Sequence, residues 1–516
     1  MPSVNEKLAA SLEILADLQK HGRRIFPSSA ISRTHRDRLK RAGFVTPVIK
    51  GWWMGTDPAA RPGDTTAWYA SLWDFCGQYC SSRFGDAWHL SPEISLSLHA
   101  EATDVPKQVV AYAPGGTNNT IELPFGTSLF DYSVDSLPDE SLLTERDGLR
   151  LLTPAGALVR VQPSFFELRP IEAQVVLAGV QDASELLVPL LKEARTVVAG
   201  RLVGAFRRIG RVDLADEIAD TMSQAGHVIR EVDPFEPELR LTEIGTRTPA
   251  IVGRLQGMWE AMRGEVVARF PEPTVDQRSP EAYLEFVDTM YERDAYHSLS
   301  IEGYRVTQTL VERVRSGEWN PDDDLRDRES RDALAARGYW LAFQGVRSAI
   351  EKVVAAPNSA GAIVRDAHRS WYRELFQPPV QAGLLESPQL AGYRTGPVYI
   401  QNSRHVPPRA EAVRHAMPAL FELLEEEEHA SVRAVLGHWM FGYIHPLPDG
   451  NGRVARFLTN VMLASGGFPW TVIRLDEREA YMSALESASV EQDIRPFASF
   501  LSKGVRRASE DAEWRR

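Results

Sequence analysis

The sequence predicts a multidomain protein in which a small helical head and an α+β middle region precede a long, all-α domain. Its 516 residues exceed what a single hydrophobic core usually serves, so two or three domains are expected. Short apolar segments bounded by Gly, Pro, Asn and Asp recur up to residue 154, whereas long helical patterns dominate from about residue 239. We therefore expect domains at 1–57, 58–235 and 236–516.

The composition is typical of a soluble globular protein, with 43% hydrophobic and 25% charged residues. No apolar run approaches the roughly 18 residues that a membrane span needs, and the first residues lack the layout of a signal peptide. We expect a cytoplasmic protein without a membrane anchor. The two cysteines, Cys76 and Cys80, are too few for a metal site or a disulfide framework, and we expect both to be small, partly buried residues.

The first 56 residues have the pattern of a small DNA-binding fold. An amphipathic helix is predicted at 5–21, a basic helix at 28–43 and a β-hairpin at 44–56. Together these elements predict a winged helix-turn-helix. With Arg41, Gly43 and Gly51 in place, the segment resembles the head of the abortive-infection type IV antitoxin family.

The head is basic although the whole chain carries a net charge of −12. Residues 1–50 hold ten Lys or Arg against four acids, a net charge of +6. Such asymmetry indicates contact with DNA phosphates, with a solvated face for protein contacts as the alternative. The candidate DNA-contacting residues are Arg33, Arg36, Arg38, Lys40 and Arg41.

The segment HPLPDGNGRVAR at 445–456 carries the clearest chemical signal. Prolines follow directly after His445, so this residue should begin a fixed loop at the end of a helix. Gly450 and Gly452 let the backbone turn its N–H groups inward at the start of a new helix. Together with the positive end of the helix dipole, they predict a cradle for phosphates.

Charged side chains surround this predicted cradle. Arg453 and Arg456 are three residues apart on one helix, so both can reach over it. Asp449 is a hard oxygen ligand suited to Mg²⁺, and His445 can accept a proton near neutral pH. A base, a metal ligand, an anion cradle and two guanidinium groups within twelve residues predict transfer of a nucleotidyl group.

These residues also resemble the signature of the Fic family, His-x-Phe-x-Asp/Glu-Gly-Asn-Gly-Arg-x-x-Arg. Leu447 stands where the family usually has Phe. The resemblance implies transfer of AMP from ATP to a Ser, Thr or Tyr hydroxyl of a target protein, with ATP as substrate and Mg²⁺ as cofactor. Gly452 argues against the phosphate-transferring branch, which tends to have Lys there. The positions that match are His445, Asp449, Gly450, Asn451, Gly452, Arg453 and Arg456.

Two further segments resemble parts of the same family. Residues 393–408 resemble the β-hairpin flap, in which Val398, Tyr399 and Ile400 would pair with an extended target segment. Tyr481 matches a tyrosine near the adenine, with ordinary core packing as the alternative.

Ser298, Glu302 and Gly303, within residues 298–303, resemble the inhibitory motif of the family. The carboxylate of Glu302 would pair with Arg456 and occupy the position of the ATP γ-phosphate.

Two other functions remain open at this point. In one, Glu302 takes part in removing AMP from a modified protein. In the other, the chain is a DNA-binding regulator whose Fic domain senses ATP. The resemblance also leaves a homo-oligomer open.

Overall fold

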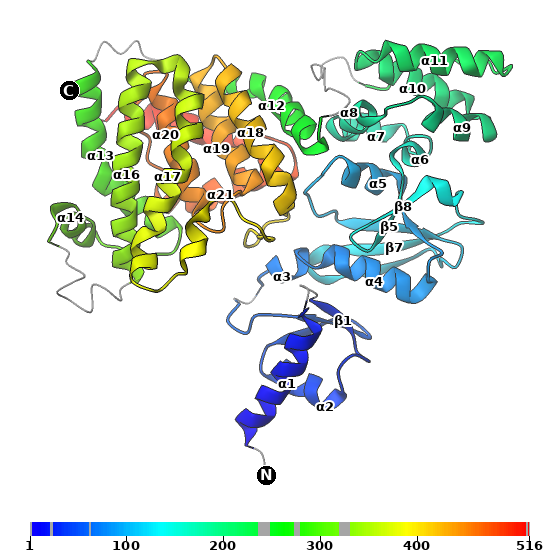
Figure 1. Ribbon diagram of the computed structural model, residues 1–516, viewed down its shortest axis with the longest axis horizontal. Coiled ribbons are helices and arrows are strands. Elements are labelled where there is room, and N and C mark those ends of the chain that lie inside the picture. The colour runs from blue at the N-terminus through cyan, green and yellow to red at the C-terminus, as the bar shows by residue number, and fades with distance from the viewer. Residues whose placement is uncertain are drawn as a thin grey trace. The chain divides into compact units, whose positions relative to one another are not determined.

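The computed structural model describes residues 3–20, 24–60, 63–235, 248–272, 279–318, 331–511 and 514. The chain divides into two compact units (Figure 1). Unit 1 comprises Met1–Ala250 and Tyr399–Val406, and unit 2 comprises Ile251–Val398 and Pro407–Arg516. The boundary predicted at residue 236 falls outside the described residues.

Unit 1 begins with two helices and a three-stranded sheet. The predicted helices form α1 and α2, and the predicted hairpin forms β2 and β3. A strand that the sequence did not predict, β1, pairs with β3, so the strand order is β1-β3-β2 and both pairs are antiparallel. The elements are α1 (Val4–Leu18), β1 (Ile25–Pro27), α2 (Arg33–Arg41), β2 (Val45–Ile49) and β3 (Trp52–Gly55).

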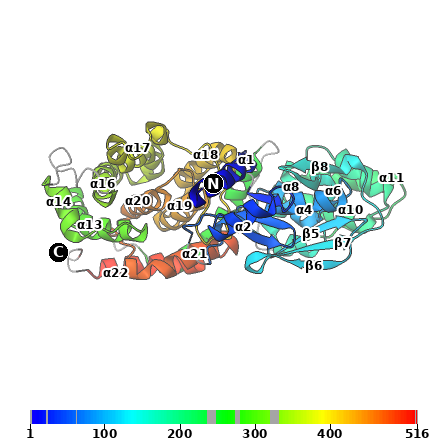
Figure 2. The same ribbon diagram turned by 90° about the horizontal axis from the view of Figure 1, so that it is seen from below.

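A second sheet follows, with the strand order β4-β5-β7-β6. Its central pair, β5 and β7, is parallel, and the outer pairs are antiparallel. Figure 2 shows β5, β7 and β6 next to one another. The strands predicted at 108–113, 120–125 and 149–154 correspond to β5, β6 and β9. The elements are α3 (Thr66–Tyr69), α4 (Leu72–Phe84), β4 (His89–Leu90), α5 (Pro92–His99), β5 (Gln108–Ala113), β6 (Asn119–Glu122), β7 (Ser128–Ser133), β8 (Leu143–Arg146) and β9 (Leu149–Leu152).

Helices complete unit 1 after the β8-β9 hairpin. They are α6 (Pro154–Leu158), α7 (Ser164–Leu168), α8 (Pro170–Gly179), α9 (Ser184–Lys192), α10 (Thr196–Arg208) and α11 (Val212–Gln224). Within the described residues, no single helix has the length and apolarity of a membrane span; the bent pair α8 and α9 meets these criteria only when the two are taken together.

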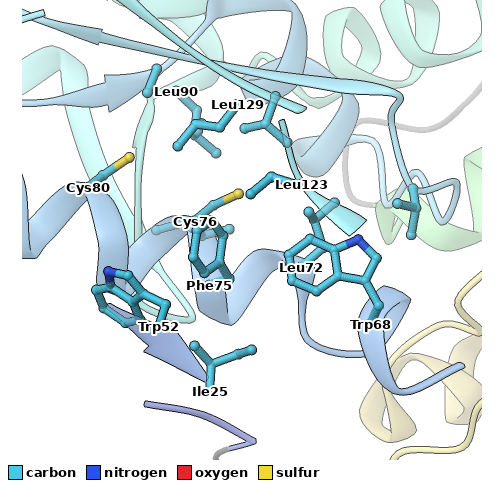
Figure 3. Close-up of a cluster of buried hydrophobic side chains, with 14 of the residues drawn as sticks. Ile25, Trp52, Trp68, Leu72, Phe75, Cys76, Cys80, Leu90, Leu123 and Leu129 are labelled. Atoms are coloured by element: carbon cyan, nitrogen blue, oxygen red, sulfur yellow. The ribbon is translucent and has the colours of Figure 1, made fainter. Parts of the chain in front are cut away.

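One hydrophobic core serves the first sheet and the region that follows it. Ile25 and Trp52 of the first sheet pack with Phe75 of α4 and with Leu129 of β7 (Figure 3). Cys76 lies in the same cluster and, like Cys80, is fully buried rather than partly buried. Burial raises the pKa of both thiols, so the two cysteines are neutral core residues.

The regular secondary structure in the described part of unit 2 consists of helices. Figure 1 shows α16 to α20 side by side, and α16 also packs against α13. The helices are α12 (Ala250–Arg269), α13 (Pro280–Ile301), α14 (Gln308–Ser316), α16 (Arg331–Ala355), α17 (Ala360–Gln381), α18 (Ala410–Glu426), α19 (Ala430–Ile444), α20 (Asn451–Ala464), α21 (Arg478–Val490) and α22 (Arg495–Ser509).

The predicted β-hairpin at 393–408 is not formed, since these residues contain no strand. Prolines at positions 397, 407 and 408 lack the N–H donors that a ladder needs. Residues Tyr399–Val406 belong to unit 1, and part of this stretch pairs with residues 103–105 instead. The Val105 N–H donates to the Arg404 carbonyl at 2.8 Å, and the Val406 N–H donates to the Thr103 carbonyl at 2.9 Å.

Candidate active site

The loop predicted after His445 is present between α19 and α20. Helix α19 ends at Ile444, and His445 adopts the left-handed conformation with φ of +49°. Gly450 has φ of +77° directly before α20, a conformation that favours glycine. Leu447 is fully buried, so it fills the apolar position of the loop.

The side chain of Asn451 holds this loop closed. Its Oδ1 accepts the Leu447 N–H at 2.9 Å, and its Nδ2 donates to the Leu447 carbonyl at 2.9 Å. Both ends of the amide are therefore used within the loop. The resemblance to the Fic signature implies that Asn451 contributes to binding the nucleotide phosphates, whereas in the structure its side chain bonds the loop backbone.

The two predicted arginines lie on α20 and are both buried. The guanidinium of Arg453 lies 4.9 Å from the ring centre of Phe376 and 5.4 Å from that of Tyr304. Arg453 Nε and Arg456 Nη1 have no hydrogen-bond partner among the described residues. Buried donors on positive groups are costly to leave unpaired, so this site fits an anion such as a phosphate.

Arg456 contacts Ser298 and Glu302, two residues of the candidate inhibitory motif. Arg456 Nη2 donates to Glu302 Oε1 at 2.7 Å, and its Nε donates to Ser298 Oγ at 2.8 Å. Glu302 caps the end of α13, and Gly303 turns the chain with φ of +87°. Burial acts to raise the pKa of Glu302, but the charges of Arg456 and Arg453 outweigh it and the pKa is lowered. The carboxylate is thus ionised in this contact.

The imidazole of His445 is in the state that a general base requires. Burial, with a smaller contribution from the charge of Arg394, lowers its pKa to about 4. The charges of Glu302 and Asp449 act in the opposite direction but do not restore the usual value. The ring is therefore neutral near pH 7 and can accept a proton.

Asp449 lies at the exposed mouth of the loop, where its side chain is 66% accessible. Its Oδ1 accepts the N–H of Gly450 at 2.5 Å. No group of three or more His, Cys, Asp or Glu that could hold a metal occurs in the described part of the chain. A single carboxylate beside an anion site nevertheless fits Mg²⁺, which usually takes one or two carboxylates together with phosphate oxygens and water.

Tyr481 lies in the protein core, 1% exposed. Its hydroxyl is 2.7 Å from His438 Nε2, and His438 Nδ1 is 2.7 Å from Thr459 Oγ1. Tyr481 is therefore packed in the core, as the alternative to adenine contact expected. Through His438 it is joined to α19 and to Thr459 of α20.

The predicted docking residues lie where the chain passes from unit 2 to unit 1. Val398 belongs to unit 2, whereas Tyr399 and Ile400 belong to unit 1. The ring of Tyr399 lies 5.2 Å from the guanidinium carbon of Arg24, within unit 1.

Two of the candidate DNA-contacting residues of α2 form hydrogen bonds within the head. Arg36 donates to the Ser28 carbonyl, and Arg38 donates to Lys7 and Ser11 of α1. The exposed members of the set are Arg33, Lys40 and Arg41.

Sequence reasoning missed several residues of the site. Tyr304 and Phe376 hold Arg453, and Arg394 contacts the loop of His445. Only the place of Tyr304, directly after the inhibitory motif, offered a local signal.

The fold and site define a helical domain with an anion-binding loop at the start of a buried helix. Residues 362–463 match the model of the Fic/DOC family, so the chain contains a Fic domain.

Among curated proteins, the chain is 39% identical over 119 residues to a protein adenylyltransferase Fic of Nematostella vectensis, covering 22% of this chain and 27% of that protein. It is 29% identical over 217 residues to a protein adenylyltransferase Fic of Drosophila virilis, covering 41% of this chain and 40% of that protein. The match thus spans well under half of either relative. Among solved structures, Fic-1 of C. elegans has 17% identity and a TM-score of 0.35, over 65% of this chain and 85% of that one.

Proposed function

We propose that this protein is a nucleotidyltransferase that moves AMP from ATP to a hydroxyl side chain of a target protein, and that Glu302 restrains it. The contact between Arg456 and Glu302 carries the proposal. An anion-binding arginine within a Fic signature is occupied by a carboxylate of the same chain, beside a buried Nη1 that has no partner among the described residues.

In the proposed reaction, neutral His445 takes the proton of a Ser, Thr or Tyr hydroxyl. The hydroxyl oxygen forms a bond to the α-phosphorus of ATP, and the bond from that phosphorus to the bridging oxygen breaks. Pyrophosphate leaves with the electron pair of that bond. Arg453 and Arg456 bind the β- and γ-phosphates, and backbone N–H groups at the start of α20 face the phosphates.

Asp449 would hold Mg²⁺ together with phosphate oxygens, and the ion would supply positive charge to the phosphates. Its carboxylate is exposed and lies 3.8 Å from Arg453 Nη2, next to the proposed phosphate position.

Glu302 restrains the reaction because it occupies the guanidinium group that the γ-phosphate needs. Arg456 already donates three bonds to Ser298 and Glu302. ATP would bind without its γ-phosphate fixed, so the α-phosphorus would not be in line with the attacking oxygen.

The test uses wild-type, Glu302→Gly and Glu302→Gly/His445→Ala proteins with Mg²⁺ and α-labelled ATP, with and without cell lysate. We expect strong labelling of protein by Glu302→Gly, weak labelling by wild type and none by the double variant. A γ-labelled ATP control should give no label, because pyrophosphate leaves. No label from any variant that binds ATP would contradict AMP transfer and favour ATP sensing.

AMP removal is tested with the same proteins. A protein labelled by Glu302→Gly is isolated and then incubated with wild type or with Glu302→Gly. Loss of AMP only with wild type would assign Glu302 a part in removal.

A further inference from the structure

Arg394 is a buried residue of unit 2, and it contacts the peptide groups around His445. Its backbone N–H donates to the Pro446 carbonyl at 2.9 Å. Its side chain donates through Nε to the His445 carbonyl at 2.8 Å and through Nη2 to the Ile444 carbonyl at 3.3 Å. Three consecutive carbonyl groups are therefore held by one residue.

These carbonyl groups need an external donor. The last carbonyls of a helix have no partner within the helix, and α19 ends at Ile444. Pro446 and Pro448 provide no N–H groups for the loop that follows. A cation at this end of the helix also interacts favourably with the helix dipole. Arg394 meets all of these requirements, which explains why a guanidinium group is buried here.

The same side chain joins the two ends of the segment that was predicted as the flap. Its Nη1 donates to the Gly396 carbonyl at 3.1 Å, and its Nη2 also donates to the Pro408 carbonyl. The chain leaves unit 2 after Val398 and returns to it at Pro407. Arg394 thus fixes the distance between the departing and the returning chain.

We propose that Arg394 is a positioning residue that sets the orientation of His445 and the spacing of the two ends of the segment that was predicted as the flap. This inference rests on the proposed AMP transfer. A guanidinium group has five N–H donors in a rigid, planar fork, whereas a lysine has three donors on one atom. Lysine can therefore keep the charge at this position but not the set of contacts.

The electrostatic role of Arg394 can be separated from its geometric role. Burial is the main cause of the low pKa of His445, and the Arg394 charge lowers the pKa further. Glu302 and Asp449 are the opposing charges that face the ring. Loss of the Arg394 charge should consequently raise the pKa of His445, whereas a lysine that keeps the charge should raise it less.

The test compares Arg394→Lys and Arg394→Gln in the Glu302→Gly background. We expect kcat for labelling to fall by about 10- to 100-fold in both variants, since small displacements of a catalytic group have effects of this order. ATP affinity should change less than about twofold, because Arg453 and Arg456 are untouched. The acid limb of the pH–rate profile should move to higher pH in Arg394→Gln and less in Arg394→Lys.

Arg433 offers a matched control. It is also buried in unit 2, and it donates to the Glu427 and Glu428 carbonyls and to Ser465 Oγ. Arg433→Lys should destabilise the fold to a similar extent but leave kcat and the pH profile within about twofold. An equal loss of kcat in Arg433→Lys would show a general effect on stability and overturn the proposal.

Hydrogen exchange gives a readout that does not depend on activity. In folded Arg394→Lys, amides in 394–408 and in 441–451 should both exchange faster than in wild type, while those of α16 should not. Unchanged exchange in either segment would overturn the proposal that Arg394 positions both of them. If Glu302→Gly does not transfer AMP but both segments lose protection, the proposed function fails and the structural role of Arg394 remains.

Discussion

The Glu302 carboxylate occupies the space next to Gly452 where a side chain would begin. A Cβ atom on Gly452 would stand 2.6 Å from Glu302 Oε1 and 3.1 Å from Arg456 Nη1. The missing side chain on α20 therefore allows the carboxylate to reach the guanidinium group.

Gly452→Ala should destabilise the wild-type protein by about 1–3 kcal/mol, because the new methyl group overlaps with Glu302. Gly452 does not have a positive φ, so alanine otherwise suits this helical position. In the Glu302→Gly background, the same substitution should be neutral or stabilise by up to about 1 kcal/mol. Urea unfolding of the four proteins measures both effects, and an equal loss in both backgrounds would rule out the overlap as the cause.

Asn451→Ala should reduce AMP transfer without weakening ATP binding, because the amide of Asn451 bonds the Leu447 backbone. It should also lower the free energy of unfolding by about 1–3 kcal/mol, since it leaves buried backbone groups unpaired. Binding of a fluorescent ATP analogue and urea unfolding check the two effects. A tenfold loss of ATP affinity with unchanged stability would instead assign the side chain to the nucleotide.

Asp294→Asn should stabilise the protein relative to wild type as the pH rises. Asp294 is buried on α13, one turn before Ser298, and accepts the Tyr339 hydroxyl at 2.6 Å. Burial raises its pKa from 3.8 to about 6, so wild type loses stability between pH 4 and 6, as the unfolded carboxyl releases its proton first. The difference between the variants should change by roughly 2 kcal/mol over this range.

Urea unfolding of both proteins at pH 4.5 and pH 7 measures this change. Asp288→Asn provides a surface comparison, since Asp288 lies on the same helix and contacts Arg347 at a partly exposed position. A difference between Asp294→Asn and wild type that does not vary with pH would show that Asp294 ionises normally.

His445 should remain neutral in the folded protein well below pH 6.5. Its pKa of about 4 in the fold means that the unfolded chain binds the proton first, so this residue favours unfolding as the pH falls from 6.5 towards 4. NMR of the ring protons, assigned by comparison with His445→Ala, measures the titration. A midpoint at or above 6.5 would contradict the burial and the charge of Arg394 as described.

Arg38→Ala should loosen the packing of α1 on α2, because Arg38 donates to Lys7 and Ser11. Arg33→Ala and Arg41→Ala should leave that packing intact, since Arg33 pairs with the Asp37 carboxylate and Arg41 donates to the Asp37 carbonyl, both on their own helix. Circular dichroism during urea unfolding checks this difference. DNA binding by the head is then tested with Arg33→Ala/Lys40→Ala/Arg41→Ala, and salt-dependent duplex binding that survives this variant would contradict the predicted contacts.

Features that depend on neighbouring residues could be predicted from the amino-acid sequence. The loop after His445, the start of α20 and the helices and hairpin of the head were readable because prolines, glycines and apolar spacing act within a few residues. Glu302 and Arg456 are 154 residues apart in the chain, and their contact was predicted only through resemblance to a family.

Contacts between donors and acceptors that are far apart in the chain became apparent only in the folded structure. The side chain of Asn451 bonds the loop backbone, and Tyr481 lies in the core. Arg404 and Val406, predicted to belong to a hairpin, pair with residues 103–105 instead. Arg394 gave no local signal, because its partners at Ile444 and His445 lie about 50 residues away. Such contacts depend on the packing of whole elements, and a single sequence does not report which buried carbonyl a distant side chain will reach.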